Sequence, residues 1–447
     1  MGSNSVKTVV TVGPACDSYE LLKRLILGGA DVFRFNLSHG NEDYFRKAVS
    51  NLRKAEEDTK RKILVFFDLP GPKLRTGKVH GDRLEIKEGT EYTFGKHGQI
   101  QISDDILKII NMKSKILLSD GKIEFKPIRK EMGLLVARAL NNGTMLDEQS
   151  INFKGISYPG RYPTKKDEEG IKFGLSLGIN AFALSFIASA KDIASARKIA
   201  GENSTLIAKI ERIEAVKHFD DIVHEADIVM IARGDLGLNI DIADLPEIQK
   251  KLLAICNENS KPVITATQML ESMTNNVMPT RAEADDVFTA ISEGTDAVML
   301  SEETAIGSYP LKALKMLKRI ISKYHYSWTL KRYKITDEHD AILNSAIDLA
   351  ISTKINKIIT FTPSGRSAFR LSRYHLPIEI VAVTDNISTF SKLFFSRNVK
   401  GVFVKSLRDE EKRLMQIAKA HRIKKAIIVS GLSLSENSTE NVRIISF

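Results

Sequence analysis

Three charged residues lie at the ends of two apolar segments in the middle of the chain. Lys209 lies within the segment 205–210, which is followed at once by Glu211, and Asp235 follows the segment 227–232. Short apolar runs with polar borders predict buried strands, and the helical spacing between them predicts a strand–helix–strand unit. Ligands of α/β folds bind at the carboxyl ends of the strands, so we expect these three side chains to meet at a binding site.

The residue types suit phosphoryl or enolate chemistry at a divalent metal. Two carboxylates, with water and substrate oxygens completing the shell, are the usual protein share of a Mg²⁺ site. An ammonium beside such a metal stabilises a transferring phosphoryl group or a developing enolate. Lys209 and Glu211 are two residues apart, so they share one face of an alternating strand. A structural ion pair between Lys209 and one carboxylate is the alternative, and these residues alone leave it open.

Other predicted strands also end in polar side chains. Alternation places Arg34, Asn36 and Ser38 on one face at the end of the strand predicted at 30–37, with Arg34 a candidate phosphate ligand. Further polar residues at or just after the ends of predicted strands are Asp68, Arg75, Thr267, Ser301 and Glu303. Each by itself is also explained by capping of a following helix. Their common position at strand ends favours one shared site.

The order of the predicted elements explains how these residues can meet. Eight apolar segments read as strands, most of them followed by a segment with helical spacing: 7–12, 30–37, 62–69, 180–186, 205–210, 227–232, 262–267 and 296–301. Eight such units predict a (β/α)8 TIM barrel. An open doubly wound sheet is the alternative, and it is less favoured because charged or hydroxyl residues follow nearly every strand.

Two other regions depart from this rhythm. Residues 76–149 contain short alternating runs separated by Gly, Asn and Asp, which predicts a small all-β lid domain inserted into a barrel domain of residues 1–75 and 150–328. After a polar boundary at 328–339, residues 340–447 repeat strand and helix patterns, which predicts a C-terminal α/β domain.

The composition narrows the classes of partner. The 447-residue chain is 43% hydrophobic and 27% charged with a formal net charge of +11. No apolar run reaches the ~20 residues that span a bilayer, and no basic stripe with interleaved aromatics is present, so we expect no membrane and no nucleic-acid partner. The charge suits phosphorylated metabolites.

Cys16 and Cys256 have no metal or redox spacing, which predicts packed thiols. The N-terminal residues lack an export signal, so we expect a cytoplasmic protein.

Eight stretches together resemble the pyruvate kinases, in the family's order and over nearly the whole chain. They are TVGPA (11–15), FRFNLSHG (33–40), DLPGPKLRTG (68–77), KIERIEAV (209–216), ARGDLG (232–237), ATQMLESM (266–273), PTRAEADDV (279–287) and MLSEETAIG (299–307). The resemblance implies a barrel with a β lid and a C-terminal α/β domain. It also implies phosphoryl transfer from phosphoenolpyruvate to ADP, giving pyruvate and ATP in the final step of glycolysis, by a homotetramer.

The resemblance also implies roles for individual residues. Lys209 resembles the lysine that stabilises the phosphoryl group and the enolate, and Glu211 and Asp235 resemble the ligands of Mg²⁺ or Mn²⁺. The remaining implied roles are phosphate bridging by Arg34, substrate binding by Gly234, Asp235 and Thr267, proton delivery by Ser301 and Glu303, and nucleotide contacts by Asn36, His39, Arg75 and the lid residue Asp120.

One departure from the family concerns a monovalent cation. Potassium-requiring members hold K⁺ with Asn, Ser, Asp and Thr. Asn36, Ser38 and Asp68 are present here, but Leu69 stands in the threonine's place and Lys73 replaces a glutamate. An ammonium near Asp68 would supply the charge of potassium, so we expect that K⁺ is not required. The alternative is that Lys73 is a solvated loop residue.

The C-terminal domain has a candidate effector loop. TPSGRSA (362–368) lies between a predicted strand and a predicted helix, and the family uses the equivalent loop for phosphorylated allosteric effectors. The residues are Thr362, Ser364, Gly365, Arg366 and Ser367, and a plain helix start is the alternative. Two other functions stay open: a different phosphoenolpyruvate or pyruvate enolate enzyme, and a catalytically weakened metabolite-binding regulator.

Overall fold

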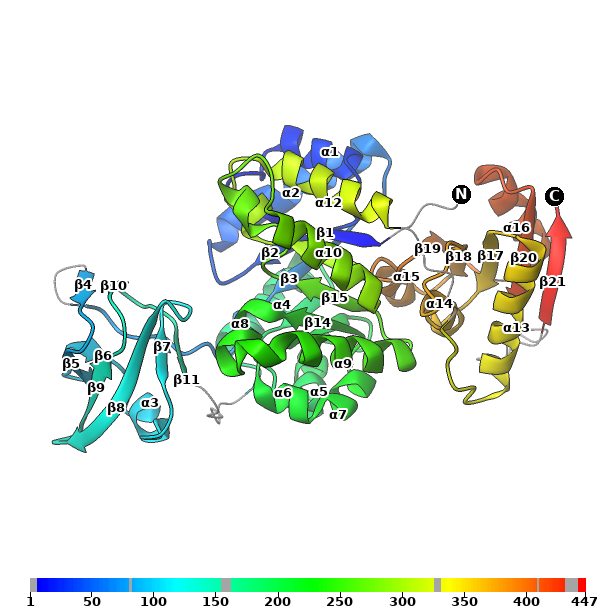
Figure 1. Cartoon of the computed structure of the whole chain (residues 1–447). Coiled ribbons are helices and arrows are strands. Elements are labelled where there is room, and N and C mark those ends of the chain that lie inside the picture. The colour runs from blue at the N-terminus through cyan, green and yellow to red at the C-terminus, as the bar shows by residue number, and fades with distance from the viewer. Residues whose placement is uncertain (1–5, 80–82, 154–161, 325–330, 408–409, 431–440) are drawn as a thin grey trace.

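The structure is a computed structural model and describes residues 6–79, 83–153, 162–324, 331–407, 410–430 and 441–447. Figure 1 shows a central barrel with a small β domain on one side and an α/β domain on the other. Residues 328–330, at the start of the predicted polar boundary, lie outside the described residues. Among the described residues, no helix is long and apolar enough to cross a membrane.

Eight parallel strands form a closed barrel in the order β1-β16-β15-β14-β13-β12-β3-β2. They are β1 (Lys7–Val12), β2 (Val32–Asn36), β3 (Leu64–Asp68), β12 (Ala181–Leu184), β13 (Thr205–Ile210), β14 (Ile228–Ala232), β15 (Val263–Ala266) and β16 (Ala297–Leu300). The pairing of β1 with β16 closes the sheet. The predicted TIM barrel is therefore confirmed, and the open sheet is excluded.

Helices cover the outside of the barrel because one face of each is apolar. They are α1 (Tyr19–Leu27), α2 (Glu42–Thr59), α4 (Lys165–Ser176), α5 (Ala190–Ala200), α6 (Ile213–Lys217), α7 (Phe219–Glu225), α9 (Leu245–Glu258), α10 (Arg281–Glu293) and α12 (Pro310–Lys323). The short helices α8 (Arg233–Asn239) and α11 (Glu302–Ala305) follow the carboxyl ends of β14 and β16. Two 3-10 turns, η1 (Ile242–Asp244) and η2 (Glu271–Thr274), lie between them. Capping boxes at Thr164 and Thr280 fix where α4 and α10 begin.

Alternation along the strands builds the barrel interior from apolar layers. Val9, Val32, Phe66, Ile207 and similar residues form one buried cluster inside the strands. Two positions further along several strands, the inward-facing residue becomes polar or charged. The barrel therefore has an apolar floor and a charged mouth at its carboxyl end.

The inserted lid is mainly β structure, as predicted, with one short helix among its described residues. Its strands are β4 (Arg83–Ile86), β5 (Glu91–Gly95), β6 (Ile100–Gln101), β7 (Ile116–Leu118), β8 (Ile123–Glu131), β9 (Leu134–Ala139), β10 (Gly143–Leu146) and β11 (Ile151–Phe153), and its helix is α3 (Asp104–Ile109). The lid sheet extends beyond the predicted end at residue 149, because β11 pairs antiparallel with β7 while the chain returns to the barrel.

The C-terminal α/β domain is also confirmed. In the described part of the domain the sheet has the order β19-β18-β17-β20-β21, in which β21 is antiparallel and the other four strands are parallel. The strands are β17 (Lys357–Phe361), β18 (Glu379–Thr384), β19 (Val399–Phe403), β20 (Lys425–Ser430) and β21 (Asn441–Ser446). The helices are α13 (Glu338–Thr353), α14 (Arg366–Ser372), α15 (Ile387–Leu393) and α16 (Glu410–Ala420).

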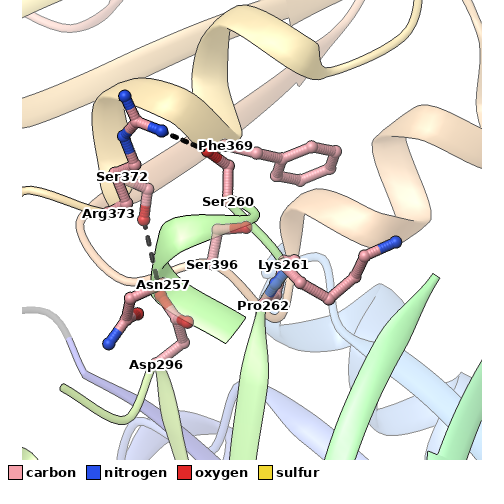
Figure 2. A pocket seen from close by; sticks show the side chains of 9 residues that line it. All are labelled: Asn257, Ser260, Lys261, Pro262, Asp296, Phe369, Ser372, Arg373 and Ser396. Atoms are coloured by element: carbon pink, nitrogen blue, oxygen red, sulfur yellow. Dashed lines mark hydrogen bonds between the residues drawn. The ribbon is translucent and has the colours of Figure 1, made fainter. Parts of the chain in front are cut away.

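The C-terminal domain closes the floor of the barrel. Phe395 is fully buried in the cluster of barrel-interior residues, with its ring centroid 6.2 Å from that of Phe66. Beside it, Asp296 Oδ1 accepts the backbone N–H of Arg397 at 3.0 Å. Figure 2 shows the small polar cavity at this interface, where Arg373 reaches Ser260. Both apolar and polar contacts therefore join the two domains.

Candidate active site

Lys209 lies at the centre of the charged barrel mouth. The residue is 7% exposed, and its Nζ lies 2.7 Å from Glu211 Oε1, 3.1 Å from Asp68 Oδ1 and 2.7 Å from Ser185 Oγ. Burial would lower the pKa of Lys209, but the carboxylates of Asp68 and Glu211 outweigh it and raise that pKa. Lys209 therefore remains an ammonium although it is removed from water.

Arg34 reaches the same carboxylate from the neighbouring strand. Its Nε lies 2.6 Å from Asp68 Oδ2, and its Nη1 donates to Thr11 Oγ1 at 3.1 Å. Burial acts to raise the pKa of Asp68, but Lys209 and Arg34 outweigh it and hold that pKa below the usual value. One carboxylate thus orients two cations, whose summed charge suits a phosphate group.

Glu211 and Asp235 are the candidate metal ligands. Glu211 is fully buried, and its Oε2 accepts the backbone N–H of Phe186 at 2.7 Å. Burial raises the pKa of Glu211, Lys209 opposes this, and nearby Asp235 adds to it. Among the described residues, no three His, Cys, Asp or Glu side chains converge on a metal position. Two adjacent carboxylates fit Mg²⁺, which keeps waters and takes substrate oxygens.

Thr267 and Gly234 meet beside the candidate metal ligands, at the ends of the neighbouring strands β15 and β14. The backbone N–H of Gly234 donates to Thr267 Oγ1 at 2.8 Å, and the hydroxyl of Thr267 donates to Ala266 O at 2.6 Å. Thr267 has a φ of +68°, a left-handed conformation that β-branched residues rarely adopt. Such strain is concentrated at functional sites.

Ser301 and Glu303 follow β16: Ser301 is the N-cap residue of the short helix α11, and Glu303 lies within that helix. Glu303 is 2% exposed, and its two oxygens accept the backbone N–H groups of Leu270 at 3.0 Å and Ser301 at 2.6 Å. Burial raises the pKa of Glu303, and these backbone N–H groups oppose the shift. Ser301 Oγ is buried and accepts or donates no hydrogen bond among the described residues. Ser301 is therefore the group with free hydrogen-bonding capacity.

The lid contributes Asp120, which sits in a left-handed turn with φ of +53°. Its Oδ1 lies 3.3 Å from Lys73 Nζ and accepts the hydroxyl of Ser150 at 2.7 Å. Lys73 Nζ also lies 3.4 Å from Asp235 Oδ1, so one ammonium joins the lid to the candidate metal site. Arg75 donates to Glu148 O at 2.9 Å at the base of the lid.

The candidate nucleotide residues lie at the rim. Asn36 Oδ1 accepts the backbone N–H of Ser38 at 3.1 Å, and the side chains of Ser38 and His39 are exposed. Partial burial lowers the pKa of His39, and the cations Arg75, Arg34 and Lys73 lower it further. A positive potential therefore covers this side of the mouth.

Comparison with known proteins decides the family. The family models for the barrel domain and the alpha/beta domain of pyruvate kinase match residues 3–314 and 340–445. The chain belongs to the pyruvate kinase family. It is 36% identical to a pyruvate kinase of Agrobacterium vitis over 98% of this chain and 96% of the relative. It is 32% identical to that of Thermotoga maritima over 99% of each chain. For the enzyme of Geobacillus stearothermophilus the identity is 37%, over 89% of this chain and 71% of the relative.

The structure corrects the predicted position of Lys73. We expected its ammonium near Asp68, in the place of the family's potassium ion. Asp68 is instead paired with Arg34, Lys209 and Ser185, whereas Lys73 contacts Asp120 and Asp235. The side chain of Lys73 lies between the lid and the barrel, where one carboxylate from each attracts it: Asp120 of the lid and Asp235 of the barrel. The alternative of a solvated loop lysine is equally wrong.

Two residues at this family site were missed from the sequence. Thr11 bonds Arg34, and Ser185 bonds both Lys209 and Asp68. Alternation would have found both, since Thr11 is two residues after Val9 and Ser185 is two residues after Ala183, which face the barrel interior.

The candidate effector loop is already engaged by a carboxylate. Asp337 Oδ2 lies 2.5 Å from Arg366 Nη2, and Asp337 Oδ1 lies 2.6 Å from Arg370 Nη1. Thr362 Oγ1 accepts the backbone N–H of Gly365 at 2.9 Å, and His339 Nε2 lies 3.1 Å from Ser367 Oγ. Sequence reasoning missed Asp337 and Arg370, whose contact joins segments about 30 residues apart.

Proposed function

We propose that this chain transfers the phosphoryl group of phosphoenolpyruvate to ADP, giving pyruvate and ATP as the final step of glycolysis in the cytoplasm. The observation that carries the proposal is the buried pairing of Lys209 and Arg34 with one carboxylate, Asp68. This arrangement holds two cations in a dry site, where they interact strongly with transferring phosphate.

The residues of the mouth have separate tasks in this proposal. Arg34 and Lys209 bind the phosphoryl oxygens, and Lys209 then stabilises the enolate that remains when the phosphoryl group leaves. Glu211 and Asp235 are the residues that would hold Mg²⁺ or Mn²⁺. When bound, the metal supplies positive charge to phosphate and enolate oxygens. Gly234 and Thr267 orient the substrate beside them.

Protonation of the enolate carbon completes the reaction. We assign the proton path to Ser301, whose buried hydroxyl lacks a hydrogen-bond partner among the described residues. The carboxylate of Glu303 accepts the backbone N–H of Ser301 and therefore sets the position of the Ser301 hydroxyl. The resemblance to pyruvate kinases implied that Glu303 also delivers the proton. In this proposal Glu303 only positions Ser301.

Nucleotide binding and lid closure are assigned to the rim. Asn36, His39, Arg75 and Asp120 bind ADP, and the positive field around His39 favours its phosphates. Closure of the lid excludes water, which would otherwise hydrolyse the transferring group. The ion pairs of Lys73 with Asp120 and Asp235 supply a contact that favours the closed lid.

We further propose that K⁺ is not required. Lys73 provides a fixed positive charge beside Asp235, and Leu69 removes one oxygen ligand from the position formed with Asn36, Ser38 and Asp68. We also propose a homotetramer, and an effector site at Thr362, Ser364, Gly365, Arg366 and Ser367 for a phosphorylated metabolite. Binding there has to displace Asp337 from Arg366.

The test is ATP formation from phosphoenolpyruvate, ADP and Mg²⁺, with and without K⁺, by wild type and Lys209→Met. We expect rapid ATP formation by the wild type and a loss of at least a thousandfold in the variant. ATP formation also separates this function from another enolate enzyme, which would consume phosphoenolpyruvate or pyruvate without ADP. A wild type no faster than Lys209→Met would end the proposal.

A further inference from the structure

The turn that follows β15 has an unusual backbone. Thr267 has a φ of +68° and Gln268 a φ of +54°. Two successive residues with a Cβ in the left-handed region are strained, and Thr267 is also β-branched. A turn of this kind persists only where its surroundings hold it.

Arg233 stabilises this turn by hydrogen bonds to its carbonyl groups. It is 7% exposed and is the first residue of α8. Its Nη2 donates to Thr267 O at 2.8 Å and lies 3.3 Å from Gln268 O, so one nitrogen binds both carbonyls of the strained turn. The guanidinium therefore bonds the two peptide groups that the left-handed conformation turns toward it.

Asp286 orients the guanidinium from a third element. Its Oδ1 lies 2.7 Å from Arg233 Nη1, and it projects from α10. The fork geometry of a guanidinium lets it bind a carboxylate and two carbonyls at once, which a lysine ammonium cannot reproduce. The contact thus ties together α8, α10 and the turn after β15.

The turn sets the position of the Thr267 hydroxyl. Its Oγ1 accepts the N–H of Gly234, the residue that directly follows Arg233. Arg233 therefore binds the two carbonyls of the turn, and the neighbouring Gly234 donates to the hydroxyl of Thr267. If the turn relaxed to negative φ, the hydroxyl would leave this position.

We propose that Arg233, oriented by Asp286, is a positioning residue that holds the Thr267–Gln268 turn in its left-handed form and so aims the Thr267 hydroxyl at the reacting substrate. The catalytic part of this inference rests on the proposed function, whereas the structural part does not. The competing explanation is a buried ion pair that contributes only to stability.

The first experiment compares Arg233→Lys with Arg197→Lys. Arg197 is a matched control, because it also binds a backbone carbonyl, Ser204 O, and a carboxylate, Asp227, but at the opposite end of the barrel. We expect Arg233→Lys to lower kcat at least tenfold with KM for phosphoenolpyruvate within threefold of wild type. Arg197→Lys should leave kcat within threefold. A kcat of Arg233→Lys within threefold of wild type would overturn the inference.

The second experiment repeats Arg233→Lys in a Gln268→Gly background. Glycine adopts positive φ without strain, and the Gln268 side chain is exposed. If Arg233 acts through the turn, Arg233→Lys should lower kcat in the Gln268→Gly background by a factor at least threefold smaller than in the wild-type background. An equal loss in both backgrounds would show that the effect does not pass through the turn, and the inference would fail.

A crystal structure of Arg233→Lys tests, without any activity measurement, whether Arg233 holds the Thr267–Gln268 turn in its left-handed form. We expect Gln268 to move to negative φ and Thr267 Oγ1 to leave the N–H of Gly234. An unchanged turn would contradict the inference even in an active enzyme.

Absence of ATP formation by wild type would instead count against the proposed function. If Arg233→Lys fails to fold, Asp286→Asn, at a half-buried position, serves for all three measurements with the same expected directions.

Discussion

Asp68 and Lys209 are 141 residues apart in the chain, and their charged groups lie 3.1 Å apart at the barrel mouth. The same carboxylate binds Arg34 through its other oxygen. A single acidic side chain thus sets the positions of both cations that we assign to the phosphoryl group.

Replacement of Asp68 by Asn should therefore disable catalysis more than folding. Lys209 and Arg34 would lose their shared anion and move, so we expect kcat/KM for phosphoenolpyruvate to fall about 100-fold, which is about 2.7 kcal/mol. Asp227→Asn is the control, because Asp227 is likewise bound by two cations, Arg197 and Lys392, at the other end of the barrel. Steady-state kinetics with equal losses in both variants would refute the special role of Asp68.

Reversal of the charge at Lys73 should create a need for potassium. Lys73→Glu would place a third carboxylate beside Asp120 and Asp235, and a bound cation would be needed to offset it. We expect wild type to keep its turnover without K⁺, and the variant to gain about tenfold or more when K⁺ is added, about 1.4 kcal/mol. Lys78→Glu, at an exposed position nearby, is the control. If wild type itself loses about 100-fold without K⁺, the proposal is wrong.

Removal of the carboxylate at Asp337 should free the effector loop. Asp337 occupies Arg366 and Arg370, so a phosphorylated effector has to compete with it. We expect Asp337→Asn to lower the half-saturating concentration of a sugar bisphosphate about tenfold, and Arg366→Ala to abolish the response. Asp348→Asn, which removes a similar exposed pair with Arg332, should change nothing. Calorimetric titration that detects no binding to Asp337→Asn would contradict the effector site.

His339 should make the C-terminal domain sensitive to mild acid. Burial and the cations Arg370 and Arg366 lower the pKa of His339 to about 4. Between that pKa and the ordinary value of about 6.5, the unfolded chain binds a proton that the folded chain does not, so stability falls as pH decreases through this window. The thermal midpoint of wild type should drop between pH 7 and pH 5, and His339→Gln should reduce the drop. An identical pH slope in the variant would exclude His339 as its source.

Phe395 should contribute strongly to stability because it fills the floor of the barrel. Truncation of a fully buried phenylalanine costs about 3–5 kcal/mol, and Phe395→Ala should lie in this range by urea unfolding. Phe403, in the same domain, is 46% exposed, so Phe403→Ala should cost less than about 1 kcal/mol. Equal costs would show that the contact with the barrel does not stabilise the protein.

The strands and most helices follow from the sequence, because local patterns encode them. The bounds of β1 and β13 agree with the ranges 7–12 and 205–210 predicted from periodicity. The short helices α8 and α11 were missed, since seven and four residues are too few for a periodic signal. The split between α6 and α7 was also missed, because the apolar spacing continues across His218.

By itself, the sequence determined the barrel, the lid, the C-terminal domain, and the family, because hydrophobic periodicity and long motifs are properties of neighbouring residues. It also placed Lys209, Glu211 and Asp235 at strand ends. Only the tertiary structure decided which charges pair. It directed Lys73 to Asp120 and Asp235 instead of Asp68, brought Asp337 to Arg366, and placed Arg233 against the strained turn of Thr267. Pairing between distant residues depends on where the closed barrel and the packed domains bring side chains together, and no local pattern carries that information.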